Sequence, residues 1–410
     1  MVIDCVAGGM ALLAAAAVGS CVYRCVTLAA IERFRSRHPV RTTEQPLVSI
    51  LKPVRGLEAD TYACFASYCR LHYPSYELLF GIQDADDPAL PILRQLQQDF
   101  PAVPMRVVVS DVRCGANLKV CNLVNLLPLA RGDILVMSDS DTVAAPDYLD
   151  GMVGALADPQ VGLVTLVYRG EGAASWSAAL ESLGLSAAFF PSVALAIAFV
   201  SPGFALGPTI ALRRDTLARL GGLEPLSDTL AEDYQLGRRV RDLGLQVHFP
   251  REVLSTRLPD TRLREVLRHR LRWARTQRIC QPAGYAAALL THGSIWCGLL
   301  AALHGFHGPA LLLWLGQQAL HWFSTLHASR VLGCRDTRRW MWLLPLSDLV
   351  EFGLWVASWL GSTVTWRGDS YRVSPGGHLT PLRRTAEQAP AGRLQDADHS
   401  VPVVAPDASH

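Results

Sequence analysis

The chain has 410 residues, which suggests about two or three domains, and 50% of them are hydrophobic. This apolar share is high for a purely soluble protein and indicates a soluble domain joined to membrane segments. The formal net charge of +2 gives no electrostatic support for nucleic acid as a partner. The 10 cysteines lack the spacing of a zinc site, and we expect free thiols in a reducing compartment.

Residues 2–23 form an apolar run, and a membrane span needs about 20 such residues. A signal peptide is the alternative, but it usually has a basic start, whereas here Asp4 begins the run and the arginines follow it. We therefore predict an uncleaved transmembrane anchor over residues 1–30. Because basic residues favour the cytoplasmic side, we expect the N-terminus outside and the chain from residue 40 onward in the cytoplasm.

An α/β domain is predicted over residues 45–260, where strand-like and helix-like segments alternate. The strand-like segments are 46–54, 76–84, 105–111, 133–141 and 161–169, with helix-like runs such as 88–99 and 117–130 between them. In such sheets ligands bind beyond the carboxyl ends of the strands. We therefore expect one site to contain the polar residues that end four of these strands, namely Lys52, Asp84, Asp111 and Asp139.

Two segments are predicted to lie at the membrane surface rather than across it. Residues 183–208 are apolar, but proline and glycine interrupt them, so we expect a segment on the membrane or a covered loop that faces the substrate. Residues 261–280 are predicted to form a basic amphipathic helix, because a cluster of arginines shares this segment with one apolar stripe.

Residues 281–366 are predicted to form a C-terminal transmembrane region, with apolar segments at 283–304, 309–328 and 340–363. The last segment contains Pro345, Asp348 and Glu351, and charges are costly in lipid, so an interfacial or re-entrant pair of half-helices is the alternative. The number of spans and the side of the C-terminus stay open. Residues 376–410 are rich in Pro, Ala, Asp and Gln and are predicted to be disordered.

Three acidic motifs occur in order along the predicted domain. They are Asp84 in GIQDADDP, Asp139 and Asp141 in MSDSD, and Glu232 and Asp233 in LAEDYQLG. Because side chains repeat with period two along a strand, the two acids of D-x-D point the same way and could hold a divalent cation that bridges a diphosphate. Taken alone, each motif is explained better by turn, loop or helix-start chemistry.

The combination is more specific than any single motif. A basic helix with Arg272 and Trp273 in HRLRW follows the acidic motifs, and this order resembles the processive and lipid-directed family-2-type glycosyltransferases with a GT-A fold. Their pattern is D, D-x-D, E-D or T-E-D, and (Q/R)-x-x-R-W. His269 stands where that pattern has Gln or Arg, but histidine can still donate a hydrogen bond to phosphate.

Longer segments narrow the resemblance to the ceramide glucosyltransferase family. They are VSILKPVRG (48–56), GIQDADDP (81–88), NLKVCNLVN (117–125), GPTIALRRDTLARLGGLE (207–224) and LAEDYQLGRRV (230–240). Two further segments, LVYRGEG (166–172) and RWARTQRICQPAGY (272–285), look most like the bacterial hopanoid-biosynthesis-associated glycosyltransferases. The resemblance covers residues 45–375.

The resemblance implies an inverting glycosyltransferase with a metal-assisted site. Asp233 is the expected catalytic base, and Asp139 and Asp141 are the expected ligands of Mg²⁺ or Mn²⁺. The residues expected to bind the nucleotide sugar are Lys52, Asp84, Lys119, Asp139, Glu232, His269, Arg272 and Trp273. For Trp273 the alternative is a packing role that seats the helix in the membrane interface.

From the resemblance we expect transfer of glucose or N-acetylglucosamine from a UDP-sugar to a hydroxyl of a membrane lipid. A hopanoid is the favoured acceptor and a ceramide the alternative. A polysaccharide synthase is disfavoured because too few spans are available to line a channel. A non-catalytic sugar-nucleotide-binding protein is disfavoured because all the acidic motifs are present. The expected location is the bacterial inner membrane, with the catalytic domain in the cytoplasm and the lipid bilayer, not nucleic acid, as a partner.

Overall fold

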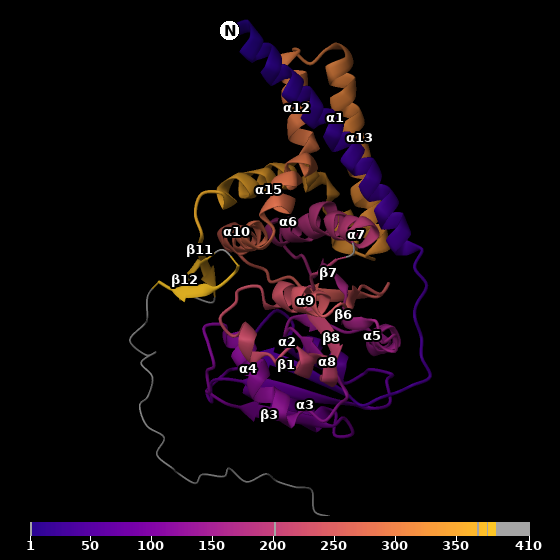
Figure 1. The fold of residues 1–410 in the computed structure, drawn as a ribbon, viewed down its shortest axis with the longest axis vertical. Coiled ribbons are helices and arrows are strands. Elements are labelled where there is room, and N and C mark those ends of the chain that lie inside the picture. The colour runs from indigo at the N-terminus through magenta and orange to yellow at the C-terminus, as the bar shows by residue number, and fades with distance from the viewer. Residues whose placement is uncertain (1, 201, 367–368, 375, 383–410) are drawn as a thin grey trace, which may run out of the picture.

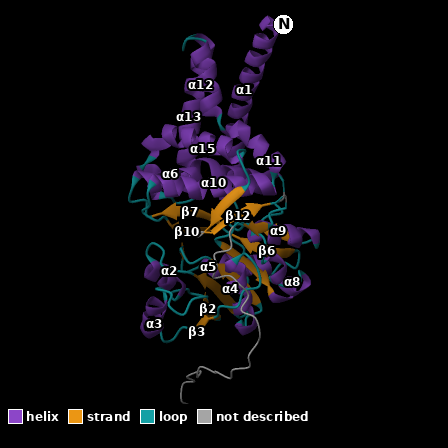
Figure 2. Ribbon diagram, turned by 90° about the vertical axis from the view of Figure 1, so that its left-hand side faces the viewer, coloured by secondary structure: helices purple, strands orange, loops and turns teal. Residues whose placement is uncertain are grey.

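The computed structural model describes residues 2–200, 202–366, 369–374 and 376–382, and arranges them in three tiers (Figure 1). A stalk at one end consists of α1 (Val2–Arg35), α12 (Gly293–Leu303) and α13 (Gly308–Val331). The next tier crosses the axis of the stalk and consists of α6 (Trp176–Gly184), α7 (Phe190–Phe199), α10 (Leu263–Cys280) and α15 (Leu344–Ser358). An α/β domain forms the third tier (Figure 2).

The α/β domain is built on a mixed seven-stranded sheet. Its strand order is β3 (Met105–Val109), β2 (Tyr76–Ile82), β1 (Val48–Val54), β4 (Ile134–Ser138), β8 (Thr209–Arg213), β6 (Val161–Thr165) and β9 (Gln246–His248). The strands β1 to β4 pair in parallel, whereas β8 runs antiparallel to β4 and β6. The prediction of an α/β sheet is confirmed, and the antiparallel β8 makes the sheet mixed.

Helices pack around this sheet, so the apolar runs become central strands buried on both faces. Residues 48–51 of β1, for example, are all buried. The helices of the domain are α2 (Thr61–Tyr68), α3 (Leu90–Asp99), α4 (Leu118–Leu126), α5 (Tyr148–Leu156), α8 (Arg214–Arg219) and α9 (Glu232–Asp242). A smaller sheet of β5 (Thr142–Val143), β10 (Val253–Arg257) and β7 (Val167–Glu171) lies between the large sheet and the crossing helices.

The core of the α/β domain extends into the lower end of the stalk. Ile31 and Phe34 of α1 belong to the same buried cluster as the strand residues, and Leu332 joins it directly after α13. The rings of Phe34 and Phe190 meet edge to face, with centroids 5.4 Å apart. Since these contacts are continuous, the stalk and the domain form one packed unit.

Two helices in the described part of the chain are long and apolar enough to cross a membrane, Ala7–Arg35 and Trp176–Phe199. A third candidate is the bent pair Pro282–Thr291 and Gly293–Leu303, whose halves meet at 50°. The second candidate falls largely in the predicted surface segment 183–208. Figure 1 shows its two parts, α6 and α7, lying across the stalk rather than along it.

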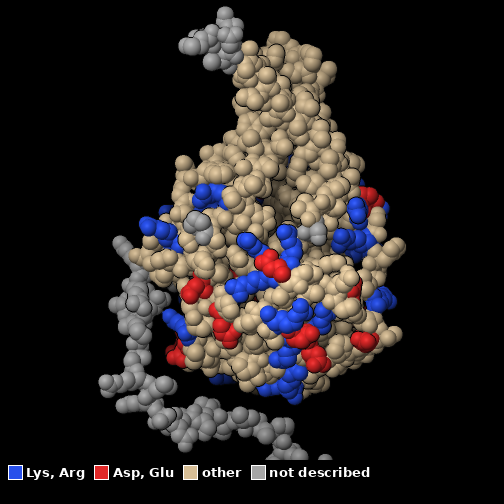
Figure 3. Space-filling model, viewed as in Figure 1, with Lys and Arg blue, Asp and Glu red and all other residues tan. Residues whose placement is uncertain are grey.

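The stalk has the composition of a membrane-embedded unit. Residues 5–23 and 293–329 contain no Lys, Arg, Asp or Glu. The face of the stalk in Figure 3 is accordingly free of charged side chains, whereas basic and acidic groups cover the domain below it. Arg24 in α1 and Arg330 at the end of α13 are the first charged residues after these two segments, and Arg33 and Arg35 follow in the last turn of α1.

Residues 340–363 do not form the single spanning helix that their apolar composition allowed. Helix α15 has 15 residues. A helix of that length reaches about 22 Å, less than the roughly 30 Å of a bilayer core. The two acids of this helix have partners inside the protein: Asp348 accepts a hydrogen bond from Ser294 at 2.6 Å, and Glu351 pairs with Arg270. Asp348 and Glu351, which would be costly in lipid, therefore lie in a short helix of the crossing tier and interact with residues of α12 and α10.

Part of the predicted disordered tail is ordered. Strand β13 (Leu379–Pro381) pairs with β12 (Asp369–Val373), which pairs with β11 (Thr363–Trp366). Leu379 is buried in one cluster with Leu230 and Val364, an apolar contact that the polar composition of the tail did not reveal. The prediction of disorder over 376–410 is therefore corrected for residues 376–382, and residues 383–410 lie outside the described residues.

Helix α4 lies so close to β2 that glycine is required at position 81. Asn122 on α4 donates its side-chain N–H to the carbonyl oxygen of Gly81 at 2.7 Å. A Cβ atom at Gly81 would lie 1.9 Å from Asn122 Oδ1. This close approach fixes α4 against the sheet and thereby places Lys119, in the first turn of α4, at the carboxyl edge of the strands.

Gly81→Ala is expected to lower the melting temperature by about 5 °C or more, because the added methyl group forces Asn122 or the whole of α4 to move. Scanning fluorimetry of the full chain in detergent measures the shift. Gly353→Ala is the matched control, since no atom lies within 4 Å of a Cβ at that position. Equal melting temperatures for the two variants would contradict the close approach.

Candidate active site

A cavity of about 780 Å³ lies between the carboxyl end of β4 and helix α10. Its walls come from the α/β domain, from the crossing helices and from the C-terminal sheet. Eight of the residues singled out in the sequence line it: Lys119, Asp139, Asp141, Glu232, Asp233, His269, Arg272 and Trp273. The fold therefore brings three motifs that are far apart in the sequence into one cavity.

The D-x-D motif forms a turn between β4 and β5. The N–H of Asp139 donates to the carbonyl oxygen of Pro208 at 3.1 Å, and the Thr142 hydroxyl donates to the carbonyl oxygen of Asp139 at 2.7 Å. These bonds use the backbone of Asp139, so its carboxylate is left to face the cavity. The motif is at once a strand-end turn and a pair of acids in a binding cavity.

Lys119 connects the acidic motifs. Its Nζ lies 2.7 Å from Asp139 Oδ1 and 2.9 Å from Glu232 Oε1. Burial lowers the pKa of Lys119, but the carboxylates of Asp139 and Glu232 outweigh it and raise the pKa well above its ordinary value. The ammonium group is therefore permanently charged and holds two acids from different elements together.

Asn117 positions Lys119 from the start of α4. Its side-chain oxygen accepts hydrogen bonds from the backbone N–H groups of Lys119 at 3.1 Å and Val120 at 3.2 Å, which caps the helix. Its side-chain nitrogen donates to the carbonyl oxygen of Thr229 at 2.8 Å and to Glu232 Oε2 at 3.2 Å. One buried amide thus ties the start of α4 to the segment that leads into α9.

Lys52 does not line the cavity, although the sequence predicted a contact with the nucleotide sugar. Its Nζ is buried beneath the D-x-D turn, where it donates to the carbonyl oxygen of Asp139 at 2.7 Å and to the Thr142 hydroxyl at 3.2 Å. It also lies 3.6 Å from the centroid of the Tyr68 ring. Burial lowers the pKa of Lys52 to about 7. The structure gives this lysine the position of a support for the turn.

Asp84 also lies outside the cavity lining. Its side chain is exposed and accepts a hydrogen bond from the N–H of Asp86 at 2.9 Å. Gln83, the preceding residue, lines the cavity instead. Both residues follow the end of β2 at Ile82, where the chain bends, and the bend directs Gln83 to the cavity while Asp84 stays exposed.

Asp233 occupies the first turn of α9 and lines the cavity. Its carboxylate accepts a hydrogen bond from the N–H of Tyr234 at 2.8 Å. Burial, followed by the charge of Glu232, raises the pKa of Asp233 to about 7. A carboxylate with such a pKa can accept a proton near neutral pH, which is the property required of a general base.

Helix α10 presents two faces with different tasks. His269 and Trp273 line the cavity with their rings 4.5 Å apart, and His269 Nδ1 lies 3.2 Å from Glu181 Oε1 of α6. Arg272 lines the same cavity. Arg270 is buried on another side, where it donates to the carbonyl oxygen of Leu180 at 3.1 Å. The basic helix is thus packed against α6 on one side and directs Arg272 to the cavity on the other.

The C-terminal sheet forms a wall of the cavity, and it was not predicted from the sequence. Tyr371 of β12 is one of its wall residues. The loop before β13 accepts a hydrogen bond at Gly377 O from the N–H of Leu230 at 2.9 Å, and the N–H of Leu379 donates to Asp228 O at 2.8 Å. The sheet therefore holds the segment that directly precedes Glu232. The alternating residues TVTW at 363–366 were the signal that could have indicated a strand.

Asp139 and Asp141 are the carboxylates available to a divalent cation. Burial and the neighbouring Asp139 charge raise the pKa of Asp141 to about 7. The two carboxylates therefore repel each other, and a bound cation would reduce this repulsion. Among the described residues, no group of three or more His, Cys, Asp or Glu side chains is arranged to hold a metal by itself. The donors fit a cation such as Mg²⁺ that takes one or two carboxylates and completes its shell with phosphate and water.

Comparison with known proteins shows the family. The chain matches the family model "Glycosyl transferase family 21" over residues 12–379. The chain belongs to glycosyl transferase family 21. Relatives of this chain are named ceramide glucosyltransferase, so the protein is a hexosyltransferase, as the sequence predicted.

Two relatives and one solved structure show how far the similarity extends. Ceramide glucosyltransferase 3 of Caenorhabditis elegans is 22% identical over 372 residues, which is 85% of this chain and 78% of that protein. Ceramide glucosyltransferase of Gibberella zeae is 30% identical over 182 residues, covering 41% of this chain and 34% of that protein. The mannosyltransferase PcManGT from Pyrobaculum calidifontis, solved with GDP-Man and Mn²⁺, aligns with a TM-score of 0.52 at 20% identity and covers 81% of this chain and 99% of that one. This likeness shows the GT-A-type fold.

Leu379→Asp is expected to reduce transferase activity about tenfold or more, because a buried charge at this position undocks the C-terminal sheet from Leu230. Thr380→Asp introduces the same charge at the next, exposed residue and is the matched control. Initial rates of sugar transfer measure both variants. Equal activity of the Leu379 variant and the control would show that the sheet does not support the site.

Proposed function

We propose that this family 21 protein catalyses the inverting transfer of a hexose from a UDP-sugar to a hydroxyl group of a membrane lipid. The observation that carries the proposal is the composition of one cavity. Its lining includes Asp139 and Asp233 of the α/β domain together with Glu181 and Leu185 from the helical tier beneath the stalk. A donor at the strand ends and a lipid arriving through the crossing tier would therefore meet in a single space.

Asp233 is proposed to act as the base. It accepts the proton of the acceptor hydroxyl while that oxygen forms a bond to the anomeric carbon of the sugar. The bond between this carbon and the diphosphate oxygen breaks, the configuration inverts, and the nucleoside diphosphate leaves with the electron pair. The raised pKa of Asp233 suits this role, since a general base works best when its pKa lies near the pH of the reaction.

Cationic groups around the cavity are proposed to stabilise the leaving diphosphate. Arg272 has a planar guanidinium that matches phosphate oxygens, and His269 can donate a second hydrogen bond. Asp139 and Asp141 would hold Mg²⁺ or Mn²⁺, which when bound supplies charge neutralisation for the diphosphate. The solved mannosyltransferase structure that contains GDP-Man and Mn²⁺ supports a divalent cation for this fold. Lys119 keeps the acids oriented in either case.

A hopanoid is proposed as the acceptor, with ceramide as the second candidate. The segments 166–172 and 272–285 support the first, because they look most like hopanoid-associated enzymes. The names of the relatives support the second. Glucose and N-acetylglucosamine are the proposed sugars.

The catalytic domain is proposed to face the cytoplasm of a bacterial inner membrane. Arg33 and Arg35 support this side, because they follow the charge-free part of α1 and basic residues favour the cytoplasm. The UDP-sugar would then reach the cavity from the aqueous side, and the acceptor lipid from the bilayer.

A transfer assay tests the proposal. The purified full chain is given UDP-glucose or UDP-N-acetylglucosamine, Mn²⁺ or Mg²⁺, and either a hopanoid polyol or ceramide, and lipid products are identified by mass spectrometry. We expect a glycosylated hopanoid, loss of product with a chelator, and recovery with added cation. Product from ceramide alone would assign the acceptor to the second candidate. Tight binding of the nucleotide sugar without any lipid product would contradict the proposed reaction.

Asp233→Asn is expected to lower the turnover number by about 10² to 10⁴, because the amide cannot accept the proton. Binding of the UDP-sugar should change little, since the side chain keeps its shape. Asp242→Asn, at the exposed end of the same helix α9, is the matched control and should keep the wild-type rate. Calorimetric titration with the donor separates a binding defect from a chemical one. Full turnover by the Asp233 variant would show that another group is the base.

The wild-type rate is expected to fall as the pH drops through about 7, because Asp233 must be ionised to accept a proton and its pKa is raised to about 7. Above this pH the base is deprotonated and the rate levels off. A pH–rate profile of kcat/KM for the free enzyme measures the transition. A rate that stays constant down to about pH 4, the ordinary pKa of Asp, would contradict the assignment.

A further inference from the structure

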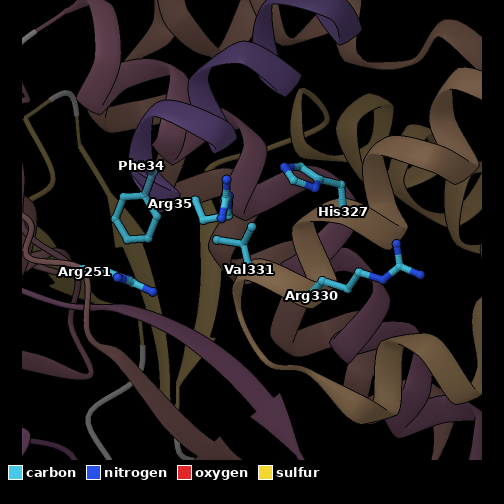
Figure 4. Close-up of a pocket in the computed structure, with 6 residues that line it drawn as sticks. All are labelled: Phe34, Arg35, Arg251, His327, Arg330 and Val331. Carbon is cyan, nitrogen blue, oxygen red and sulfur yellow. The ribbon is translucent and has the colours of Figure 1, made fainter. Parts of the chain in front are cut away.

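A second cavity, of about 380 Å³, lies at the base of the stalk, away from the catalytic cavity. Figure 4 shows the six side chains that line it: Phe34, Arg35, Arg251, His327, Arg330 and Val331. They come from three parts of the chain, namely the end of α1, the end of α13 and the loop between β9 and β10. We call this cavity the basal crevice. No acidic residue is among its six lining residues.

The basal crevice has more positive than negative charge. Glu32, one turn before the end of α1, neutralises the charge of Arg35, whose Nε donates to Glu32 Oε2 at 2.8 Å. His327 Nε2 lies 3.3 Å from the same oxygen. Arg251 and Arg330 are exposed, and neither side chain has a hydrogen bond or ion pair with another described residue. Figure 4 shows Arg251 and Arg330 on opposite sides of the crevice, so the two guanidinium groups add positive charge to it from both sides.

The position of the basal crevice identifies the kind of anion. Arg35 ends α1, and Arg330 is the first charged residue after the charge-free segment 293–329. If the stalk crosses the bilayer, the crevice lies at the level of the lipid headgroups, where arginines are attracted to anionic lipids. Phe34 and Val331 add an apolar wall beside the cationic groups, which suits the glycerol end of a lipid.

We propose that the basal crevice binds the headgroup of an anionic phospholipid, which the positive charge of Arg251 and Arg330 on its two sides attracts. A guanidinium matches two phosphate oxygens at once. Arg251 belongs to the α/β domain and Arg330 to the stalk, so a headgroup in the crevice would lie between the catalytic domain and the stalk. This site is independent of the sugar-transfer chemistry proposed above.

Native mass spectrometry of the delipidated full chain tests the proposal. The probes are phosphatidylglycerol, phosphatidylcholine and inorganic phosphate at equal concentrations. Arg251→Gln/Arg330→Gln is expected to weaken phosphatidylglycerol binding about tenfold or more, since each arginine near a membrane surface contributes a severalfold gain in affinity. Arg251→Lys/Arg330→Lys should retain part of the affinity, because it keeps the charge and loses only the bidentate geometry.

Arg94→Gln/Arg219→Gln is the matched control, because it removes two exposed arginines of the α/β domain that do not line the crevice. It should bind phosphatidylglycerol as the wild type does. Melting temperatures of all variants show whether each is folded. Wild-type affinity in a folded Gln double variant would overturn the proposal. Equal binding of phosphatidylcholine, or displacement of the lipid by inorganic phosphate at equal concentration, would also overturn it, because the site would then not select an anionic lipid.

Discussion

The ion pairs of Lys119 with Asp139 and Glu232 are the interactions on which the geometry of the catalytic cavity depends. They join the start of α4, the end of β4 and the start of α9, three elements that are remote in the sequence. Without the ammonium group, the two acids would face Asp233 in a partly buried space with no cation between them, which is costly. The close contact of α4 with β2 therefore matters for chemistry, because it determines where this ammonium group lies.

The crossing tier solves a second problem, which is how a water-soluble donor and a membrane lipid reach one cavity. Helix α10 is central to this arrangement. Its period of 3.6 residues places His269 and Arg272 on the cavity side, while Arg270 lies on another side and pairs with Glu351 of α15. One basic helix thus serves as a wall of the site and as a partner of the membrane-proximal helices. Glu351, one of the two acids that seemed costly in a membrane span, compensates the charge of Arg270.

The sequence allowed the prediction of those features that depend on local pattern. Apolar strands followed by polar residues predicted the sheet and the place of Asp139 at its carboxyl edge, whereas Asp233, in the first turn of α9, was expected in the site only from the family resemblance. The local pattern could not tell Gln83 from Asp84, because both follow the end of β2, where the chain bends and strand alternation no longer determines which side chain faces the cavity. The position of Lys52 beneath the turn could not be predicted either, because the turn that folds over it consists of residues 139–142, far along the chain. The C-terminal sheet was missed because its contacts with residues 228–230 are non-local and involve mainly backbone atoms.

The position of the C-terminal sheet in the chain has a consequence for biosynthesis. Tyr371 and its neighbours are synthesised after the apolar segments of the stalk, yet they form a wall of a cavity whose acids were made more than 100 residues earlier. A nascent chain therefore carries the complete set of carboxylates before it has an enclosed cavity. The enclosure forms only when the last apolar helices have been placed and the chain returns to the α/β domain. The catalytic cavity can therefore be completed only after the apolar helices have been assembled at the membrane.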